Sequence, residues 1–263
     1  MLPRSQGAGP LFTIVTPVLD GLPWLPEAVA SVTSQADVEL ELIIADGGST
    51  DGSREWLKNL RDDRVTVVLD HDSGQADALA RHFSHARGSI LGWLNADDLL
   101  EQGALARVAA AFREHGEASI VSGACSLIDA AGNVVGRIDP PPSGTFQGLL
   151  NYPRNLAQPA TFFSAAAYRR TTGIDPRLQY AMDVDLWLKL ARLGPAVLLP
   201  IVLARFRMHP AAKSSRAATA MVREDLKVRL AHGMPTFSRA ARTLFRWAYL
   251  RPLRARIRQW LAR

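Results

Sequence analysis

Two adjacent carboxylates, Asp97 and Asp98, follow directly on an apolar run at residues 89–94. An apolar run without polar alternation is typical of a buried strand in a parallel sheet, and ligands of open α/β sheets bind beyond the carboxyl ends of such strands. Because two close carboxylates repel each other unless a cation lies between them, this pair predicts a site for a divalent ion and a phosphorylated ligand. The alternative is that both residues cap the helix that follows.

Polar groups also end two earlier apolar runs. Thr16 and Pro17 end the run at residues 11–16, and Asp46 ends the run at 40–45, before the glycine-rich turn 47–53. Several polar groups at one sheet edge, with a glycine-rich turn between them, indicate a nucleotide site. We expect Asp46 to contact a ribose hydroxyl or the N–H of a uracil-like base, whereas Asp51 caps the next helix.

These groups need a scaffold that brings strand ends together. The apolar patterns predict strands at 11–16, 40–45, 65–69 and 89–94, alternating with helices at 24–35, 51–60, 74–86 and 101–114. Such alternation predicts βαβ units and a parallel sheet, an α/β fold. The later pattern is less regular and predicts strands at 118–128, 134–138, 160–164 and 197–206, and helices at 183–193 and 217–231.

Other features of the middle of the chain have simpler explanations. The proline-rich segment 139–144 is expected to be a loop and a candidate mobile cover. Trp93 and Trp187 lie within apolar periodicity, so core packing is favoured over stacking on a ligand. The single cysteine, Cys125, is expected to be a buried small hydrophobe.

Composition limits the class of protein. The 263 residues, 48% of them hydrophobic, are enough for one large domain or two small ones. Residues 1–10 lack the pattern of a signal peptide, and no window approaches the roughly 18–20 apolar residues of a spanning helix. We therefore expect a cytoplasmic protein, one that can also lie on the inner face of the cell membrane as a peripheral protein.

The positive charge is concentrated at the C-terminus. Residues 236–263 contain eight arginines and no lysine, aspartate or glutamate, so the rest of the chain holds 23 basic against 25 acidic residues. This distribution weakens any case for a nucleic-acid partner. Arginines interleaved with tryptophan and other apolar residues favour an amphipathic helix on an anionic membrane surface. The alternative is a helix docked on the body or on another subunit.

A series of short motifs, taken in order, resembles glycosyltransferase family 2. The matching segments lie between about residues 11 and 216, at 13–18, 43–53, 72–78, 93–98, 158–163, 180–190, 206–210 and 213–215. The resemblance implies a GT-A fold: a Rossmann-like, mostly parallel sheet flanked by helices, with a mixed second half and a C-terminal helical tail. Composition and the extent of the motifs together predict a flexible N-terminus at 1–10, one domain at 11–235 with a nucleotide-sugar half (11–98) and an acceptor half (99–235), and a basic tail at 236–263.

The resemblance also assigns roles on the donor side. Asp46 resembles the family's acidic contact to base and ribose, and residues 95–98 resemble its Asp-x-Asp metal motif, with Asn95 in place of the first acid. Asn95 and Asp97 are therefore expected beside the donor and Asp98 on the metal, although either carboxylate can be the direct ligand. His209 resembles a late histidine that completes metal or diphosphate binding; its alternative is an ordinary surface histidine.

Residues at the starts of two helices, together with Thr16 and Pro17, complete the predicted site. Gly74 and Asp77 begin the helix at 74–86 and are expected near the donor, as are Thr16 and Pro17. Asp183 resembles the family's general base, although Met182 replaces the glutamate that usually precedes it. The alternative for Asp183 is the N-cap of its helix.

The implied chemistry explains why these groups are needed. An inverting transfer is a single displacement, so a carboxylate must take the proton of the attacking hydroxyl. A divalent ion stabilises the leaving nucleoside diphosphate, and hard oxygen ligands favour Mn²⁺ or Mg²⁺. We expect a UDP-linked donor and a glycan or lipid-linked acceptor in cell-surface polysaccharide synthesis. The alternatives are a sugar nucleotidyltransferase and a non-catalytic nucleotide- or sugar-binding protein.

Overall fold

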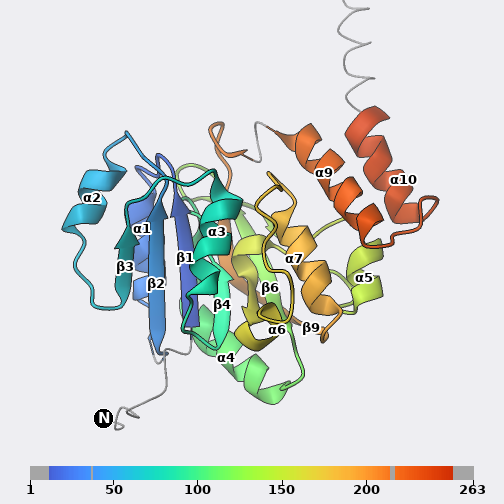
Figure 1. Cartoon of the computed structure of the whole chain (residues 1–263), viewed down its shortest axis with the longest axis horizontal. Coiled ribbons are helices and arrows are strands. Elements are labelled where there is room, and N and C mark those ends of the chain that lie inside the picture. Colours follow the sequence, from blue (N-terminus) through green and yellow to red (C-terminus); the bar gives the residue numbers. More distant parts are fainter. Residues whose placement is uncertain (1–11, 37, 214–216, 251–263) are drawn as a thin grey trace, which may run out of the picture.

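The computed structural model describes residues 12–36, 38–213 and 217–250. Within these residues, nine strands form one sheet in the order β3-β2-β1-β4-β8-β6-β9-β5, with β7 beside β6 (Figure 1). The strands are β1 (Phe12–Val18), β2 (Leu40–Asp46), β3 (Val65–Val68), β4 (Ile90–Trp93), β5 (Leu99–Leu100), β6 (Ile120–Ile128), β7 (Val134–Ile138), β8 (Thr161–Ser164) and β9 (Ala196–Arg207).

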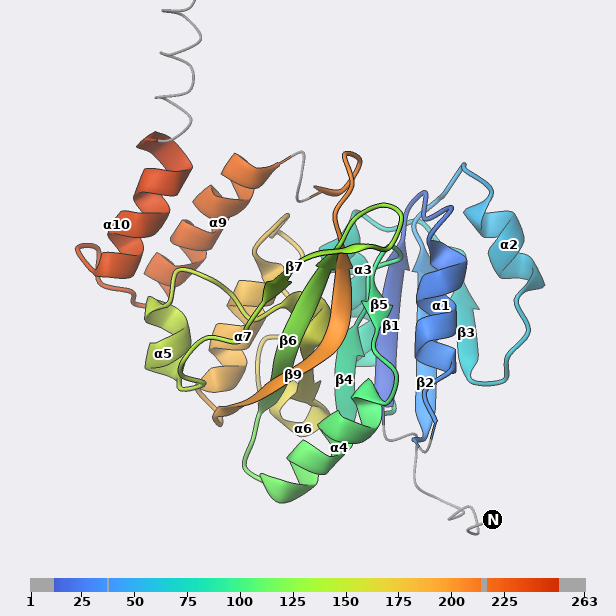
Figure 2. The same cartoon turned by 180° about the vertical axis from the view of Figure 1, so that it is seen from behind.

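Helices cover both faces of the sheet. Figure 1 shows α3, α6 and α7 in front of it, and Figure 2, from behind, shows α1 and α4 on the opposite face. The helices are α1 (Leu25–Thr33), α2 (Ser53–Asn59), α3 (Gln75–Ser84), α4 (Ala104–Glu114), α5 (Phe146–Asn151), α6 (Ala165–Tyr168), α7 (Met182–Ala191), α9 (Ala218–Ala231) and α10 (Arg239–Phe245), with the short turns η1 (Gln158–Ala160) and η2 (Arg246–Leu250).

The first half of the chain forms the parallel part of the sheet. Strands β3, β2, β1 and β4 run parallel, and side chains alternate along β1 between the two hydrophobic cores. Phe12 and Ile14 belong to the core with α1 and α4, whereas Val15 belongs to the core with α3 and α7. The second half is mixed, because β8 is antiparallel to both β4 and β6 while β9 is parallel to β6. The predicted α/β architecture with a mostly parallel sheet is confirmed.

Strand β1 continues past the predicted end at Pro17 to Val18. The Val15 carbonyl accepts a hydrogen bond from Leu94, so it faces β4, and the nitrogen of Pro17 two residues later faces the same side. Strand β4 pairs with β1 only as far as Val15. The missing N–H of Pro17 therefore costs no hydrogen bond between strands.

Residues 139–144 form the predicted loop, but the prediction that they cover the site is wrong. The Gly144 carbonyl accepts a hydrogen bond from the N–H of Ala196, at the start of β9. This contact lies at the opposite end of β9 from Arg207, where the polar groups described below gather. The loop therefore runs along the sheet and away from the predicted site.

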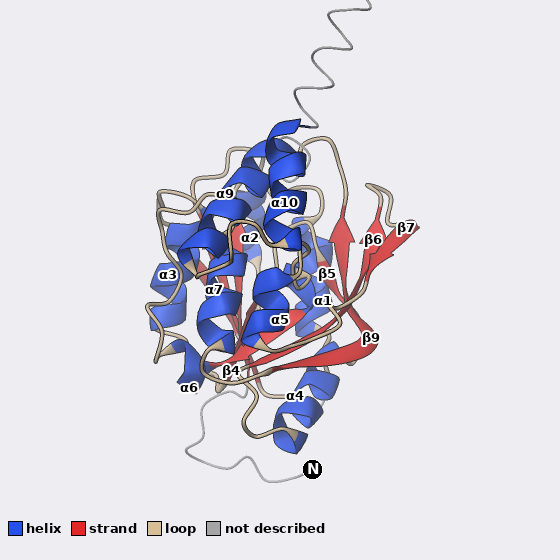
Figure 3. Ribbon diagram, turned by 90° about the vertical axis from the view of Figure 1, so that its right-hand side faces the viewer, coloured by secondary structure: helices blue, strands red, loops and turns tan. Residues whose placement is uncertain are grey.

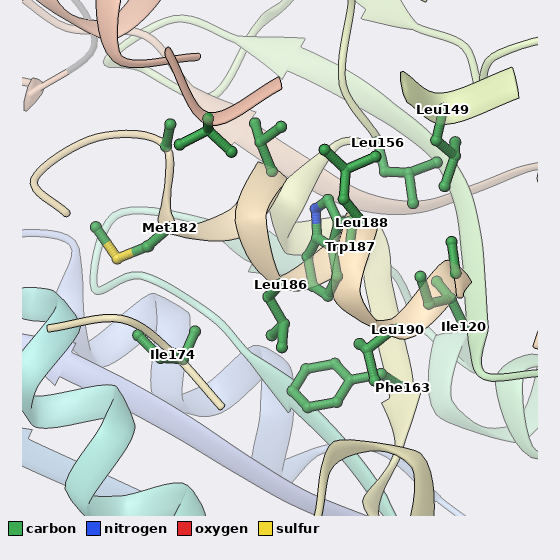
Figure 4. Packing of buried hydrophobic residues seen from close by; sticks show 14 of the residues in the cluster. Ile120, Leu149, Leu156, Phe163, Ile174, Met182, Leu186, Trp187, Leu188 and Leu190 are labelled. Atoms are coloured by element: carbon green, nitrogen blue, oxygen red, sulfur yellow. The ribbon is translucent and has the colours of Figure 1, made fainter. Parts of the chain in front are cut away.

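Aromatic packing fills the core between the sheet and α7. Trp93 and Trp187 are stacked, with ring centroids 5.4 Å apart and an interplanar angle of 17°, and Phe163 packs edge-on against Trp187. Figure 4 shows Trp187 and Phe163 among the aliphatic side chains of α7 and its neighbours. Both tryptophans are buried, which confirms their predicted place in the core. Cys125 is also buried, with a free thiol.

The described part of the C-terminal tail packs on the body. Helix α10 lies against α9 and α5, with Ala240, Ala241 and Leu244 buried (Figure 3). This arrangement corresponds to the docked alternative for residues up to 250, whereas 251–263 lie outside the described residues. No described helix combines the length and the apolar character needed to cross a membrane.

Candidate active site

The most direct convergence of predicted site residues joins Asp97 to His209. The Nε2 atom of His209 lies 3.0 Å from Oδ2 of Asp97, although the two residues are 112 positions apart. Asp97 follows β4 and His209 follows β9, so the contact depends on the ends of both strands meeting at one edge, the upper edge in Figure 1. The Asp97 side chain is 29% exposed, so it can be reached from solvent.

Asp98 has a different environment from its neighbour. Its side chain is fully buried; Oδ1 accepts the backbone N–H of Arg207 (3.0 Å) and Oδ2 accepts the Asn95 amide (3.0 Å). Burial, reinforced by the charge of Asp97, raises the pKa of Asp98 well above its ordinary value. With both oxygens engaged inside the protein, Asp98 ties β9 to the 95–98 turn. Asp97 is thus the carboxylate available to a ligand.

A chain of amides connects this pair to other elements. Oδ1 of Asn95 accepts a hydrogen bond from Gln75 (2.7 Å) at the start of α3, and its Nδ2 donates to Gln158 (3.0 Å) in η1. Nζ of Lys213 lies 3.5 Å from Oε1 of Gln75. The sequence alone indicated no role for Gln75, Gln158 or Lys213, although all three lie in the motifs that carry the family resemblance. The residue types alone did not indicate that these three side chains would lie close together.

Asp183 lies in the first turn of α7, where its Oδ1 accepts the N–H of Val184 (2.8 Å). The N-cap position is occupied by Ala181, so the capping alternative does not describe Asp183. Burial raises the pKa of Asp183 to about 7; the charge of Asp225 adds to this effect and that of Arg229 opposes it. A carboxylate with such a pKa is suited to accept a proton near neutral pH.

The charge of Asp183 acts on Lys213, which also contacts the chain of amides. Desolvation lowers the pKa of Lys213, and the negative charges of Glu224 and Asp183 oppose that change. Lys213 also lies over the ring of Tyr180, 5.3 Å from its centroid, and contacts Gln75. Lys213 therefore links the start of α3 with Tyr180, just before α7, and the charge of Asp183 acts on its ammonium group.

Glu224 holds the segment that leads into α7. Its carboxylate accepts backbone N–H groups from Gln179, Tyr180 and Ala181, at 3.2, 2.6 and 2.7 Å. These bonds fix the backbone immediately before Asp183. Nothing in the sequence distinguished Glu224 from the other charged residues of its helix, because its partners are backbone groups about 44 positions away.

Asp46 shapes the glycine-rich turn that follows β2. Its buried carboxylate accepts the N–H groups of Gly48 (3.3 Å) and Ser49 (3.2 Å), and lies 2.8 Å from Nε of Arg54. Thr16 is buried in β1, beside β2, and Pro17 is half-buried. Thr16 and Asp46 lie on neighbouring strands at the edge predicted to bind the donor, and the Asp46 side chain is already engaged by protein groups.

Gly74 and Asp77 shape the start of α3. Gly74 has φ +127°, which favours glycine, and a Cβ built there would meet no atom within 4 Å, so the backbone is open to an approaching ligand. The Ser73 N–H donates to Asp77 (3.0 Å) and Arg81 pairs with it (2.6 Å), which holds the pKa of Asp77 below its ordinary value. Asp77 therefore stabilises the helix start, and Gly74 forms the accessible surface.

The side chains at this edge could bind a hard divalent ion whose remaining ligands are oxygens of the substrate and water. Among the described residues, no group of three or more His, Cys, Asp and Glu side chains is arranged to hold a metal ion. Asp97 and His209 form a pair, and Mg²⁺-type sites commonly combine one or two protein ligands with phosphate oxygens and waters. The 3.0 Å between them is a hydrogen-bond distance, and an ion that took both groups as ligands would replace the shared proton.

The chain is similar to known proteins in sequence and in fold. Residues 13–171 match the profile described as Glycosyl transferase family 2. A PGL/p-HBAD biosynthesis glycosyltransferase of Mycobacterium bovis is 38% identical over 121 residues, which is 44% of this chain and 47% of that protein. The chain spans about a third to a half of the length of the curated relatives it matches first.

Solved structures of low identity share the fold. A mannosyltransferase from Pyrobaculum calidifontis, in complex with GDP-Man and Mn²⁺, gives a TM-score of 0.66 at 22% identity, covering 93% of this chain and 70% of that one. S. aureus TarS 1–349 in complex with UDP-GlcNAc gives 0.65 at 14% identity, covering 90% and 70%. These neighbours identify the fold as GT-A.

Proposed function

The chain belongs to glycosyltransferase family 2, and on this premise we propose that it transfers a sugar, with inversion, from a UDP-linked donor to a hydroxyl of a glycan or lipid-linked acceptor. The product would be a cell-surface polysaccharide or glycolipid. The observation that carries the proposal is the link through Lys213, which is influenced by the charge of Asp183 and contacts Gln75, the partner of Asn95 in the 95–98 turn. An inverting transfer needs a base on the acceptor side and a site for the diphosphate on the other.

The donor would bind along the edge formed by β1, β2 and the start of α3. Asp97 and His209 are the residues that would hold Mn²⁺ or Mg²⁺ together with the diphosphate, whereas Asp98 supports them from the interior. Bound there, the ion would stabilise the negative charge of the leaving nucleoside diphosphate. Support for this assignment comes from the neighbour solved with GDP-Man and Mn²⁺, and the neighbour solved with UDP-GlcNAc supports a UDP donor.

Asp183 would act on the acceptor. Its free oxygen is available to receive a hydrogen bond from the acceptor hydroxyl, since Oδ1 is occupied by the N–H of Val184. As the acceptor hydroxyl oxygen attacks the anomeric carbon, its proton passes to the Asp183 carboxylate and the bond between that carbon and the diphosphate breaks. Glu224 keeps the carboxylate in place through the backbone of residues 179–181.

The outer face of α10 and η2 supports a membrane location for this reaction. Arg239, Arg242 and Arg246 are exposed there beside Phe245 (49% exposed), whereas the Tyr249 ring, 38% exposed, packs against Arg223 of α9. Arginines beside exposed aromatic rings are suited to the interface of an anionic membrane. We therefore infer that this face rests on the membrane while the opposite face packs on α9, which would bring a lipid-linked acceptor close to Asp183.

A nucleotide-binding assay tests the donor side of the proposal. Thermal unfolding is measured with a panel of nucleotides and nucleotide sugars, with and without Mn²⁺. Ligand at about 100 times its Kd stabilises a protein by about 2.7 kcal/mol, which is about 5–10 °C for a chain of this size. We expect UDP to raise Tm in this range only when Mn²⁺ is present, and Asp97→Asn to abolish the effect. No shift with any nucleotide would reject the proposal.

A sedimentation assay tests the membrane face. The protein is mixed with phosphatidylglycerol-containing vesicles or with neutral phosphatidylcholine vesicles and centrifuged. We expect binding to the anionic vesicles only, and its loss in the double variant Arg242→Glu/Arg246→Glu. Arg113→Glu, at the exposed end of α4, is the matched control and should sediment like the unaltered protein. Equal sedimentation of the double variant would reject this location.

A further inference from the structure

Arg207 is among the largest fully buried side chains of the described residues, and it has an unusual number of partners for its position. Its side chain is 2% exposed at the end of β9, two residues before His209. A buried guanidinium is expensive to desolvate unless its donors are satisfied. Its hydrogen bonds therefore identify what it is held against.

Two of these bonds reach the 95–98 turn. The backbone N–H of Arg207 donates to Oδ1 of Asp98 (3.0 Å), and its Nε donates to the backbone carbonyl of Asp97 (2.9 Å). The second bond fixes the main chain of the residue that carries the accessible carboxylate. Arg207 thus sets the position of Asp97 without touching its side chain.

The remaining bonds anchor the guanidinium to two other elements. Nη2 donates to Glu27 of α1 (2.7 Å), and Nη1 donates to the carbonyls of Asp129 (3.4 Å) and Ala130 (3.3 Å) in the turn between β6 and β7. With these acceptors, four donor contacts of the side chain go to the protein. Arg207 is therefore directed at the scaffold and away from any ligand.

The same elements hold the ring of His209. Trp24, at the start of α1, lies against it with ring centroids 4.1 Å apart, and Nε1 of Trp24 donates to the Ala130 carbonyl (3.3 Å). The Ala130 carbonyl accepts from both Trp24 and Arg207. One anchor point therefore sets the positions of both members of the Asp97–His209 pair.

We propose that Arg207 is a positioning residue for the divalent-ion site, and that Trp24, Glu27 and the 129–130 turn form a clamp that holds it. The clamp holds the main chain of Asp97 and the ring of His209 next to each other before the ion and the diphosphate arrive. This inference rests on the metal-dependent donor binding proposed above. Supporting groups around metal ligands commonly change metal affinity by about 10- to 100-fold when removed.

The test measures Mn²⁺ binding directly, by the loss of the free-ion signal in electron paramagnetic resonance, in the presence of UDP. We expect Arg207→Gln to weaken Mn²⁺ binding about 10- to 100-fold and Arg207→Lys to restore little of it, because an ammonium cannot reach the separate acceptors. The matched control is Arg205→Gln. Arg205 is a half-exposed arginine on the same strand as Arg207 and pairs with Glu101, so this variant should bind Mn²⁺ as tightly as the unaltered protein.

Two milder variants cover the possibility that Arg207→Gln fails to fold. Glu27 is 58% exposed, so Glu27→Gln should fold and weaken Mn²⁺ binding up to about fivefold. Trp24→Leu removes the ring beside His209 and should weaken binding in the same direction. If the folded variants of Arg207, or both Glu27→Gln and Trp24→Leu, bind Mn²⁺ like the unaltered protein, the clamp is rejected. If the unaltered protein binds no Mn²⁺ with UDP, the metal site itself is rejected, and the clamp with it.

Discussion

The raised pKa of Asp183 predicts opposite effects of pH on activity and on stability. With a pKa of about 7, the carboxylate is about 10% ionised at pH 6 and about 90% ionised at pH 8. Because only the ionised form accepts a proton, the rate of transfer should rise about ninefold over this range. An ordinary carboxylate, with a pKa of 3.8, would be fully ionised throughout.

Stability should move the other way. Between pH 3.8 and about 7 the folded protein keeps a proton that the unfolded chain releases, so the stability linked to Asp183 is lost as pH rises through this window. The difference in pKa corresponds to at most about 4 kcal/mol, less whatever solvent contact relieves. Asp183→Asn, which is neutral at every pH, should therefore raise Tm by several degrees at pH 8 and by little at pH 4.

The assay combines UDP release from the donor with thermal unfolding, each measured from pH 5.5 to 8.5. Asp183→Asn should bind UDP and Mn²⁺ normally and lose transfer by about 10²- to 10⁴-fold. Asp175→Asn is the matched control, because Arg177 lowers the pKa of that carboxyl to about 2 and its replacement should reduce stability at pH 8. A flat pH profile, or a loss of Tm at pH 8 in Asp183→Asn, would refute the reasoning.

Three further predictions follow from the contacts of single residues. Asp98→Ala should lower the free energy of unfolding by about 1–3 kcal/mol in chemical denaturation, because it leaves the buried N–H of Arg207 without its acceptor; an unchanged midpoint would contradict this. Asp97→Ala should leave that midpoint nearly unchanged while calorimetry detects no Mn²⁺-dependent UDP binding, and retained binding would exclude it as a ligand. Glu224→Gln should lower kcat for transfer several-fold with little change in the Kd of UDP, since it loosens only the backbone before Asp183; Glu55→Gln, on α2, should change neither quantity.

Much of the parallel half of the fold could be predicted from the chain because its strands are continuous apolar runs. Such runs mark buried strands without knowledge of their neighbours, and the polar residue at the end of each run marks the edge where ligands bind. The apolar runs led to the prediction of a site at Asp97 and Asp98, and the family resemblance added His209 and Asp183 as predicted site residues. It did not predict the short elements β5, α5 and α6, which are too brief to show a period.

The roles of Asp97 and Asp98 show where prediction from the chain ends. The two residues have the same side chain and adjacent positions, yet one is fully buried and the other is open to solvent. What separates them is the backbone N–H of Arg207, 109 positions away, which engages Asp98. Local pattern contains no information about that partner.

The amino-acid sequence alone therefore determined the alternation of strands and helices, the edge where polar groups gather and the residue types available there, because these depend on periodicity and on neighbours along the chain. Only the tertiary structure decided which carboxylate is accessible, which pKa is raised and where residues 239–250 dock. Each of these depends on desolvation and hydrogen bonding by segments distant in the chain: β9 beside Asp98, α9 around Asp183, and α5 and α9 beneath α10.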